Sequence, residues 1–403
     1  MARSERRRSC SRGTKSALAA LALLACATPP AHAQTVADTV TFLMTNQSVS
    51  TGSVARDQAA AQAASNAIGR ALLGSLATLP VSNSTGSFTY RLNPELGTVE
   101  RADRTFGPFF VERALTIGRN QASAGVTFQH LALSSLDGQS LTDGTLVTTA
   151  NQFTDEAAPF DVDRLRLNIT ADVATLYGAI GITDRLDIGG ALPLVSLRVD
   201  GSRTNSYRGR DFEQAKASAT AVGAADALVR MKYMWVDSDG ARLSTAADVR
   251  LPTGKEEDLL GSGSVAVRFS GLASLDRGMW SAHANAGVSF GGFAREISYG
   301  AAIAVAATRR VTVSGELVAR RTDGIGTLIM ATAPHPQLAD VETIRLTTDR
   351  STHTALSFVP GFKWNVSDTW VLLANVAVPL THTGLTSPAA PFVGLDYAFG
   401  SIF

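Results

Sequence analysis

The chain has 403 residues, with 36 Lys and Arg against 35 Asp and Glu. Six of the basic residues but only Glu5 among the acidic ones fall in the first 33 positions, so the remainder carries a charge of about −4 and has no basic run that would attract nucleic acid. Both cysteines, Cys10 and Cys26, also lie in those positions, which excludes disulfides, zinc sites built on thiolates and thiol catalysis from the rest.

The first 33 residues have the composition of a secretory signal peptide. Basic residues precede the apolar run SALAALALLACA, and Ala31-His32-Ala33 supplies a small-residue cleavage site before Gln34. The apolar run is about a dozen residues, too short to span a bilayer as a helix. An alternative site, Leu23 to Cys26, has the look of a lipoprotein box and would make Cys26 an acylated N-terminus. Either site predicts an exported protein.

A helix is predicted in the segment that follows the leader. In VARDQAAAQAASNAIGRALLGSL, which begins at Val54, the apolar residues Ile68, Leu72 and Leu76 recur at helical spacing, and Pro80 ends the run. Two placements stay open: a plug inside a barrel, or a periplasmic helix that packs on a partner.

The remainder of the chain alternates like β-strands. From Asp161, DVDRLRLNITADVATLYGAIGI places apolar residues on one parity for some twenty positions, far longer than the five or six residues of a typical strand. A tilted transmembrane strand needs roughly nine to eleven residues, and no apolar run after Ala33 reaches the eighteen residues of a transmembrane helix. The pattern favours a membrane β-barrel over a soluble sandwich.

Connections alternate between short and long, as in outer-membrane barrels. Short turns are predicted at 183–185, 237–240, 276–278, 308–310 and 366–369, and long polar loops at 137–160, 200–222, 253–262 and 321–350.

The four tryptophans all lie beside short turns. Indole rings prefer the boundary between headgroups and hydrocarbon, where barrels carry aromatic girdles, whereas core tryptophans would be scattered through strand centres. We therefore predict an aromatic girdle at one membrane interface, made of Trp235, Trp280, Trp364 and Trp370.

The C-terminus alternates in the same way. Val393, Leu395, Tyr397, Phe399 and Phe403 share one parity and smaller or polar residues share the other. In an exported chain of paired strands, Tyr397, Phe399 and the terminal Phe403 resemble the C-terminal signal that the barrel-assembly machinery of the outer membrane recognises. The resemblance predicts residence in the outer membrane of a Gram-negative bacterium, among phospholipid and lipopolysaccharide.

The predicted fold is an all-β, antiparallel transmembrane barrel with a short helical N-terminal plug or periplasmic segment. Thirteen strands count from Thr105, and a strand at 87–92 makes fourteen, an even number as single-chain bacterial barrels have; twelve is the alternative if two early segments belong to the plug. The predicted divisions are the signal peptide at 1–33, the N-terminal segment at 34–85 and the barrel at 86–403.

Three segments resemble bacterial outer-membrane channels of the phenol-degradation-associated type, which are grouped with the long-chain fatty-acid and toluene transporters. These are residues 86–128, LPTGKEEDLLGSGS from Leu251, and ITDRLDIGGALPLV from Ile182. The resemblance implies passive uptake of small hydrophobic or aromatic compounds. Rival functions are a structural or adhesive barrel and a general polar porin, which should pass sugars and ions.

Strand parity predicts a charged lumen, because a charge on the lipid face at the midplane costs roughly 2 to 4 kcal/mol. Mixed signs suggest paired charges across neighbouring strands that hold the wall together. The predicted lumen residues are Arg164, Arg166, Asp172, Asp226, Arg230, Lys232, Arg242, Asp248, Arg250, Arg268, His283, Glu316, Arg320 and Lys363.

One predicted strand contains Gly189, Gly190 and Pro193, which weaken or interrupt a hydrogen-bonded ladder. They suggest a bulge or kink through which an apolar solute could leave sideways, or a conformational feature without a role in transport.

No cofactor or metal is expected, since no phosphate-binding loop, Rossmann fingerprint or zinc signature occurs, and the acidic run 256–258 lacks EF-hand spacing. The enzymatic rival is a surface esterase built on Ser281, His283 and Asn285. Residues two apart on one strand stand about 6 to 7 Å apart, which disfavours a catalytic triad. The sequence therefore predicts a protein that is not an enzyme.

Overall fold

The computed structural model describes residues 35–45, 49, 53–77, 90–93, 98–101, 104–292, 294–323, 327–349, 352–367 and 369–399, with backbone alone for 74–77 and 90–101. All of these belong to one compact unit, which begins at Thr35. The predicted leader, its cleavage site, Cys26 and Phe403 lie outside the described residues.

Two helices, α2 (Val36–Met44) and α3 (Val54–Ala77), pack against each other near the beginning of the unit. The Oγ1 atom of Thr35 caps α2 by accepting a hydrogen bond from the backbone N–H of Asp38 at 3.0 Å. The buried residues of α3 recur every three or four positions, as Ala64, Ile68 and Leu72 show. Within the described part of the chain, neither helix combines the length and the hydropathy that a bilayer-spanning helix requires.

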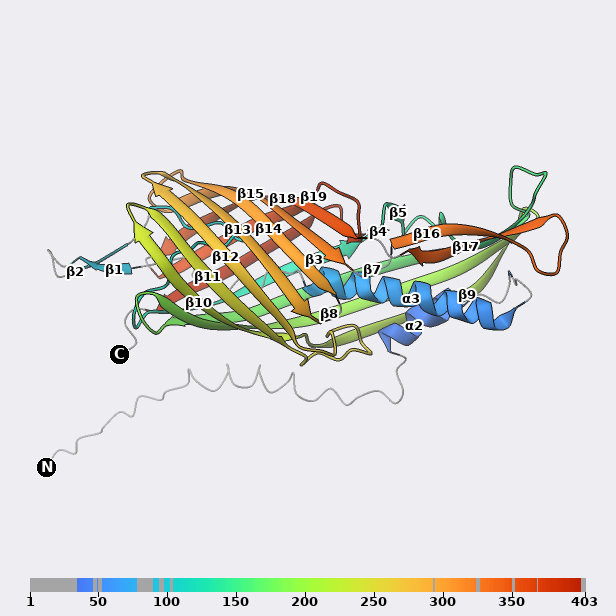
Figure 1. The fold of residues 1–403 in the computed structure, drawn as a ribbon, viewed down its shortest axis with the longest axis horizontal. Helices are drawn as coiled ribbons and strands as arrows, with labels where there is room; N and C mark the ends of the chain where they lie inside the picture. The colour runs from blue at the N-terminus through green and yellow to red at the C-terminus, as the bar shows by residue number, and fades with distance from the viewer. Residues whose placement is uncertain are drawn as a thin grey trace, which may run out of the picture. The chain divides into compact units, whose positions relative to one another are not determined.

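The described strands pair almost entirely with antiparallel neighbours (Figure 1). They are β1 (Tyr90–Asn93), β2 (Thr98–Arg101), β3 (Ala122–Leu133), β4 (Ser135–Leu136), β5 (Gln139–Ser140), β6 (Leu146–Phe153), β7 (Asp161–Gly181), β8 (Leu186–Tyr207), β9 (Arg210–Ala224), β10 (Ala227–Ser238), β11 (Ala241–Leu251), β12 (Ala266–Arg277), β13 (Trp280–Gly291), β14 (Arg295–Ala306), β15 (Val311–Asp323), β16 (Thr327–Pro334), β17 (Val341–Asp349), β18 (His353–Ser367), β19 (Trp370–Pro379), β20 (Leu385–Thr386) and β21 (Ala390–Phe399).

Twelve of the described strands form a closed ring, which we call the barrel. The order is β7, β3, β21, β19, β18, β15, β14, β13, β12, β11, β10 and β8, and the pairing of β8 with β7 closes it. The fourteen-strand prediction is wrong, and the twelve-strand alternative agrees with the structure. The expected first strand does not join the ring, because β1 pairs only with β2.

The four remaining long strands form what we call the extension, together with the outer halves of β7 and β8. There β6 and β17 continue the sheet from β7, β16 pairs with β17, and β9 pairs with β8. The helices α2 and α3 contact the strands of this sheet (Figure 1). Their apolar residues share one buried cluster with inward residues of β7 and β8, such as Leu167 and Val199.

At one end of the barrel the strands are joined by short connections, and we call it the short-turn end. These connections join β7 to β8, β10 to β11, β12 to β13, and β14 to β15. Between β10 and β11, Asp239 and Gly240 have φ angles of 46° and 80°, as the two central residues of a type I′ hairpin turn require.

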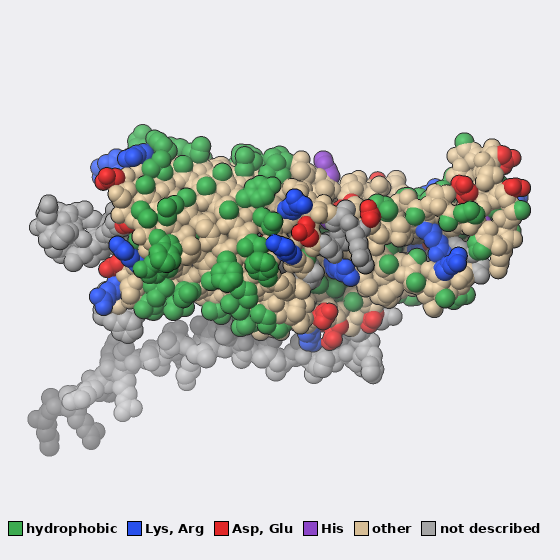
Figure 2. All heavy atoms as spheres, in the orientation of Figure 1, with side chains coloured by type: hydrophobic (Ala, Val, Ile, Leu, Met, Phe, Trp, Pro, Cys, Tyr) green, Lys and Arg blue, Asp and Glu red, His purple; other side chains and the backbone are tan. Residues whose placement is uncertain are grey.

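The outward face of the barrel is apolar. Figure 2 shows hydrophobic side chains gathered over its strands, whereas charged side chains lie at the ends and over the extension. Trp235, Trp280, Trp364 and Trp370 are exposed at the short-turn end, and Tyr397 stacks there against Trp370 with ring centroids 4.7 Å apart. A closed antiparallel ring with an apolar outer face leaves no unpaired edge in lipid, which is the condition for spanning a membrane with strands.

Candidate functional site in the barrel lumen

Residues 104–121, which we call the plug segment, lie inside the ring without regular secondary structure. Phe106, Phe109, Leu115 and Ile117 are buried, and the backbone is hydrogen-bonded to inward side chains of several barrel strands. The strand predicted from Thr105 is therefore not formed. The sequence left open whether residues 34–85 form a plug or a periplasmic helix, and the structure fills the short-turn end of the lumen with residues 104–121.

The strongest attachment of the plug segment is to Glu316 of β15. Its carboxylate accepts three consecutive backbone N–H groups, those of Phe109 at 2.6 Å, Phe110 at 2.7 Å and Val111 at 2.8 Å. The Nζ atom of Lys363 donates to the carbonyl oxygen of Pro108 at 3.1 Å. Hydrogen bonds to a buried charge are each worth more than neutral ones, about 1.5 to 3 kcal/mol, so this pair fixes the centre of the segment.

A second attachment is made by Glu112, the one carboxylate of the plug segment. It accepts hydrogen bonds from the Nη1 atom of Arg230 and from Nζ of Lys232, the latter at 3.3 Å. Arg230 also forms a two-pronged pair with Asp248 of β11, and Lys232 donates to the carbonyl oxygen of Leu115 at 2.8 Å. The buried charges of β10 and β11 are thus matched by partners on the plug segment and on each other.

A cavity of about 380 Å³ lies above the plug segment, away from the short-turn end. Phe109, Phe110 and Glu112 of the plug segment line it, as does Ala71 of α3. The volume lies within the roughly 300 to 1,000 Å³ of small-molecule sites.

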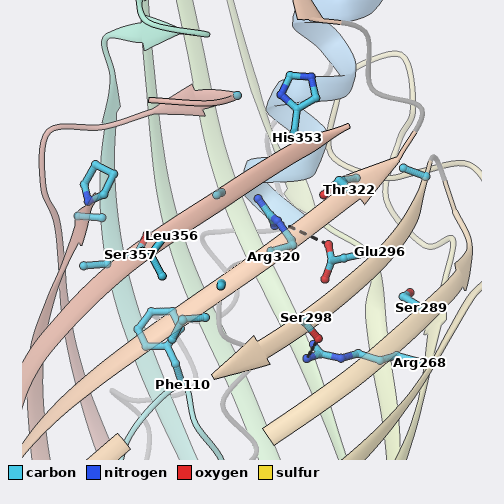
Figure 3. A pocket seen from close by; sticks show the side chains of 18 of the residues that line it. Phe110, Arg268, Ser289, Glu296, Ser298, Arg320, Thr322, His353, Leu356 and Ser357 are labelled. Carbon is cyan, nitrogen blue, oxygen red and sulfur yellow. Dashed lines mark hydrogen bonds and ion pairs between the residues drawn. The ribbon is translucent and has the colours of Figure 1, made fainter. Parts of the chain in front are cut away.

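The two arcs of the ring give this cavity two different walls (Figure 3). The charged wall comes from neighbouring strands β10 to β15 and contains Arg230, Asp248, Arg250, Arg268, Glu296 and Arg320. The apolar wall comes from β18, β19 and β3 with the adjoining loop, and contains Leu356, Val359, Ala377, Pro379, Leu131, Leu133 and Leu385.

The predicted lumen residues fall into three groups. Five line the cavity, namely Arg230, Asp248, Arg250, Arg268 and Arg320. Six others point inward but bind protein groups: Lys232, Glu316 and Lys363 bind the plug segment, Arg242 pairs with Asp237 and Asp276, Asp226 accepts N–H groups of Gly254 and Ser262, and His283 contacts Ser274 and Ser281.

The last group, Arg164, Arg166 and Asp172, corrects the prediction. These residues lie on the outward parity of β7, where Asp172 pairs with His130 at 2.7 Å, while Leu165 and Leu167 on the other parity are fully buried. The reason is that the outer half of β7 belongs to the extension, whose inner face is covered by helices instead of water.

Glu296, Phe109 and Phe110 were not predicted as cavity residues. Glu296 shares its parity with the buried Ser298, Ala302 and Ala304 of β14, so alternation alone could have found it. The two phenylalanines follow no periodic pattern, because the plug segment is irregular.

The predicted bulge or kink in β8 does not appear as a register shift between β7 and β8. Strands β7 and β8 stay in register through Gly189, Gly190 and Pro193, and the one shift along β8 occurs at Arg203 and Thr204. Pro193 lies where the other neighbour of β8 changes from β10 to β9, and its carbonyl oxygen accepts the N–H of Ala225 at 2.8 Å. The proline therefore marks a change of partner on one side of β8, whereas the register with β7 has no bulge there.

The esterase residues are only partly arranged as a triad. The Nε2 atom of His283 contacts the hydroxyl of Ser281 at 2.9 Å, but its Nδ1 atom contacts the hydroxyl of Ser274 at 2.8 Å where a triad places a carboxylate. Ser281 is fully buried and accepts a hydrogen bond from Thr105 of the plug segment. This geometry offers no substrate access to the hydroxyl.

The fold and the lumen define a membrane-spanning β-barrel of the outer-membrane class, with a plugged lumen and an internal cavity. No family model and no curated protein matches the chain. Among solved structures, an outer membrane channel from Pseudomonas putida F1 is similar, with TM-score 0.45 and 13% identity over 71% of this chain and 98% of that one. The KdgM porin has TM-score 0.37 and 7% identity over 69% and 99%, and the outer membrane protease OmpT from Escherichia coli has 0.27 and 11% over 69% and 97%.

Proposed function

We propose that the protein is an outer-membrane channel through which small hydrophobic or aromatic compounds diffuse passively, as the likeness of its sequence to phenol-degradation-associated channels implies. The observation that carries the proposal is the cavity inside the ring. It is of small-molecule size, and one arc of its wall, with Leu131 and Leu356, is apolar together with Phe110 of the plug segment. We further propose that the aromatic last strand is recognised by the barrel-assembly machinery.

Passage requires the plug segment to move. The ladder between β7 and β8 is continuous, and the cavity ends at Phe109, Phe110 and Glu112. The attachment at Glu316 holds these residues through three N–H groups, so it sets how readily the lumen opens. A solute that reaches the cavity leaves when this attachment breaks.

The test is uptake of a labelled aromatic hydrocarbon by cells with and without the protein. We expect uptake that depends on the protein and increases several-fold in the Glu316→Gln variant, because an amide replaces the charged acceptor and each weakened hydrogen bond is worth about 1 kcal/mol or more. Glu213→Gln, at an exposed position of β9, is the matched control and should leave uptake unchanged. Equal uptake with and without the protein would exclude the proposed function.

A general polar porin is the second candidate, favoured by the four arginines and three carboxylates that line the cavity. Planar bilayers separate the two. A porin should conduct ions steadily and admit sugars to liposomes, whereas the proposed channel should have low conductance that rises only in Glu316→Gln.

A further inference from the structure

The cavity has the chemistry for a solute that is itself divided into an apolar part and an anionic part. We infer, on the basis of the proposed function, that its preferred solutes are amphipathic carboxylates: an aromatic or short aliphatic body with one carboxylate group. Figure 3 shows the relevant groups, with Phe110 and Leu356 on one side of the cavity and Arg268, Arg320 and Glu296 on the other.

The arginines of the charged wall differ in how many of their N–H donors have hydrogen-bond partners. The guanidinium of Arg230 binds two carboxylates, those of Asp248 and Glu112. Arg268 on β12 donates from Nη2 to the hydroxyl of Ser298 at 2.7 Å, and its buried Nε atom has no hydrogen-bond partner. A half-buried guanidinium whose buried Nε donor is unused is costly, and a carboxylate is the ligand that matches its planar fork.

The carboxylates near Arg268 are committed elsewhere or are too distant for a hydrogen bond. Asp248 binds Arg230, and Asp226 accepts three hydrogen bonds from Gly254 and Ser262. Glu296 approaches Arg320 at 3.6 Å between Oε2 and Nε, which is an ion pair without hydrogen-bond contact. Four arginines and three carboxylates line the cavity, so positive charge exceeds negative charge there, and an incoming anion would supply the ligand that Nε of Arg268 lacks.

The opposite wall determines which body the solute can have besides its carboxylate group. Phe110 and Leu356 offer an aromatic face and an aliphatic surface, and His353, the titratable lining residue of that wall, is paired with Asp137 at 3.3 Å. A second charge at the far end of the solute would therefore be desolvated without a partner of its own. A volume of about 380 Å³ holds one small molecule. Dianions, long-chain lipids and cations are disfavoured by these features.

The test is equilibrium dialysis of the purified protein in detergent with three labelled probes of one shape: 3-phenylpropanoate, its neutral amide and 3-phenylpropylamine. We expect the carboxylate to bind about tenfold or more tightly than the amide, and the amine most weakly. In Arg268→Gln the carboxylate should fall to the affinity of the amide, while the affinity of the amide stays unchanged. Arg198→Gln removes an exposed charge on the outer face of β8 and should preserve the preference for the carboxylate over the amide.

Equal or weaker binding of the carboxylate to the native protein would overturn the inference, and this comparison needs no variant to fold. A shift to lower affinity in Arg268→Gln for amide and carboxylate alike would also overturn it, because it would indicate altered folding of the cavity instead of a lost anion contact. Neither result bears on the proposed function, which fails only if cells with the protein take up no more labelled aromatic hydrocarbon than cells without it.

Discussion

The two ends of the β7–β8 hairpin have opposite distributions of apolar and polar side chains between their outward and inward faces. In the barrel half, outward residues such as Leu176 and Leu194 are apolar and 48% and 42% exposed, while inward residues such as Thr175 and Asp187 are polar and buried. In the extension the outward residues include Asp172, Arg198 and Asp200, and the inward residues are buried aliphatic side chains. Neither strand changes its parity between the two regions.

The difference shows that the polarity of each face of the hairpin matches the medium or the protein that contacts it. Lipid contacts the outside of the barrel and polar protein groups fill its inside, whereas water contacts the outside of the extension and α2 and α3 cover its inside. The outward change falls between Asp172 and Leu176 on β7 and between Leu194 and Arg198 on β8. These positions mark the level at which the membrane ends.

The largest expected effect is a difference in stability between two variants, each of which places one charge on the outward face, on opposite sides of that level. Leu176→Arg puts a guanidinium on the lipid face and should destabilise the folded barrel by about 2 to 4 kcal/mol. Asn168→Arg, on the same outward parity but in the extension, should change stability by less than about 0.5 kcal/mol. Unfolding by denaturant in lipid vesicles measures both. Equal losses of stability in the two variants would contradict a membrane boundary between Asp172 and Leu176.

A smaller effect is expected from adding one methyl group in each region. In Gly201→Ala the new Cβ would come within 2.3 Å of Cδ1 of Leu43 and 2.8 Å of Cδ2 of Leu167, so α2 must shift. We expect a loss of roughly 1 to 3 kcal/mol, seen as faster proteolysis of α2. Gly271→Ala on the barrel meets nothing within 4 Å and is the control. Unchanged proteolysis in Gly201→Ala would contradict tight packing of α2 on β8.

The smallest expected effect concerns pH and the loops beyond the barrel. Burial alone would raise the pKa of Asp137, but hydrogen bonds from His353 and from the N–H groups of Gly384 and Leu328 outweigh burial and hold the pKa below its ordinary value of 3.8. A lowered pKa gives a stabilisation that is complete above pH 3.8 and disappears as the pH falls through the folded-state value. After correction for the pH dependence of intrinsic exchange, amide exchange near Gly384 should therefore accelerate in strong acid.

Asp137→Asn supplies the comparison for this prediction. Its loops should exchange faster at neutral pH and show no further change in acid, because the ionising group is gone. An unaltered acid response in Asp137→Asn would assign the effect to other groups.

Alternation alone predicted most of the barrel. The two-residue period located β7, β8 and the barrel strands from β10 onward, and the inward positions of Arg230, Asp248 and Arg268 follow from it. It did not locate β16 and β17, which lie in a segment predicted as a long loop. The same period misassigned Arg164 and Asp172, because parity separates two faces but does not say which face meets water. The apolar residues of α2 and α3 were the missing information, since they need an apolar surface to cover.

The plug segment could not be predicted by periodicity. Residues 104–121 are apolar enough to resemble a strand, but their backbone N–H groups bind side chains such as Glu316, Ser274 and Asp187 from distant parts of the chain. Such partners are set by closure of the whole ring. The count of fourteen was wrong because it included a strand from Thr105 and one at 87–92, and neither is part of the ring.

Strand β8 touches both N-terminal pieces of the described chain. Near one end Asp187 accepts the N–H of Ile117 at 2.9 Å, and near the other end the guanidinium of Arg203 donates to the carbonyl oxygen of Leu43 at 3.1 Å. A strand rises about 3.3 Å per residue, so these anchors are held roughly 50 Å apart by one stiff segment. The chain between Leu43 and Ile117 must bridge that fixed span, so one strand sets the separation between the α2 helix and the plug segment.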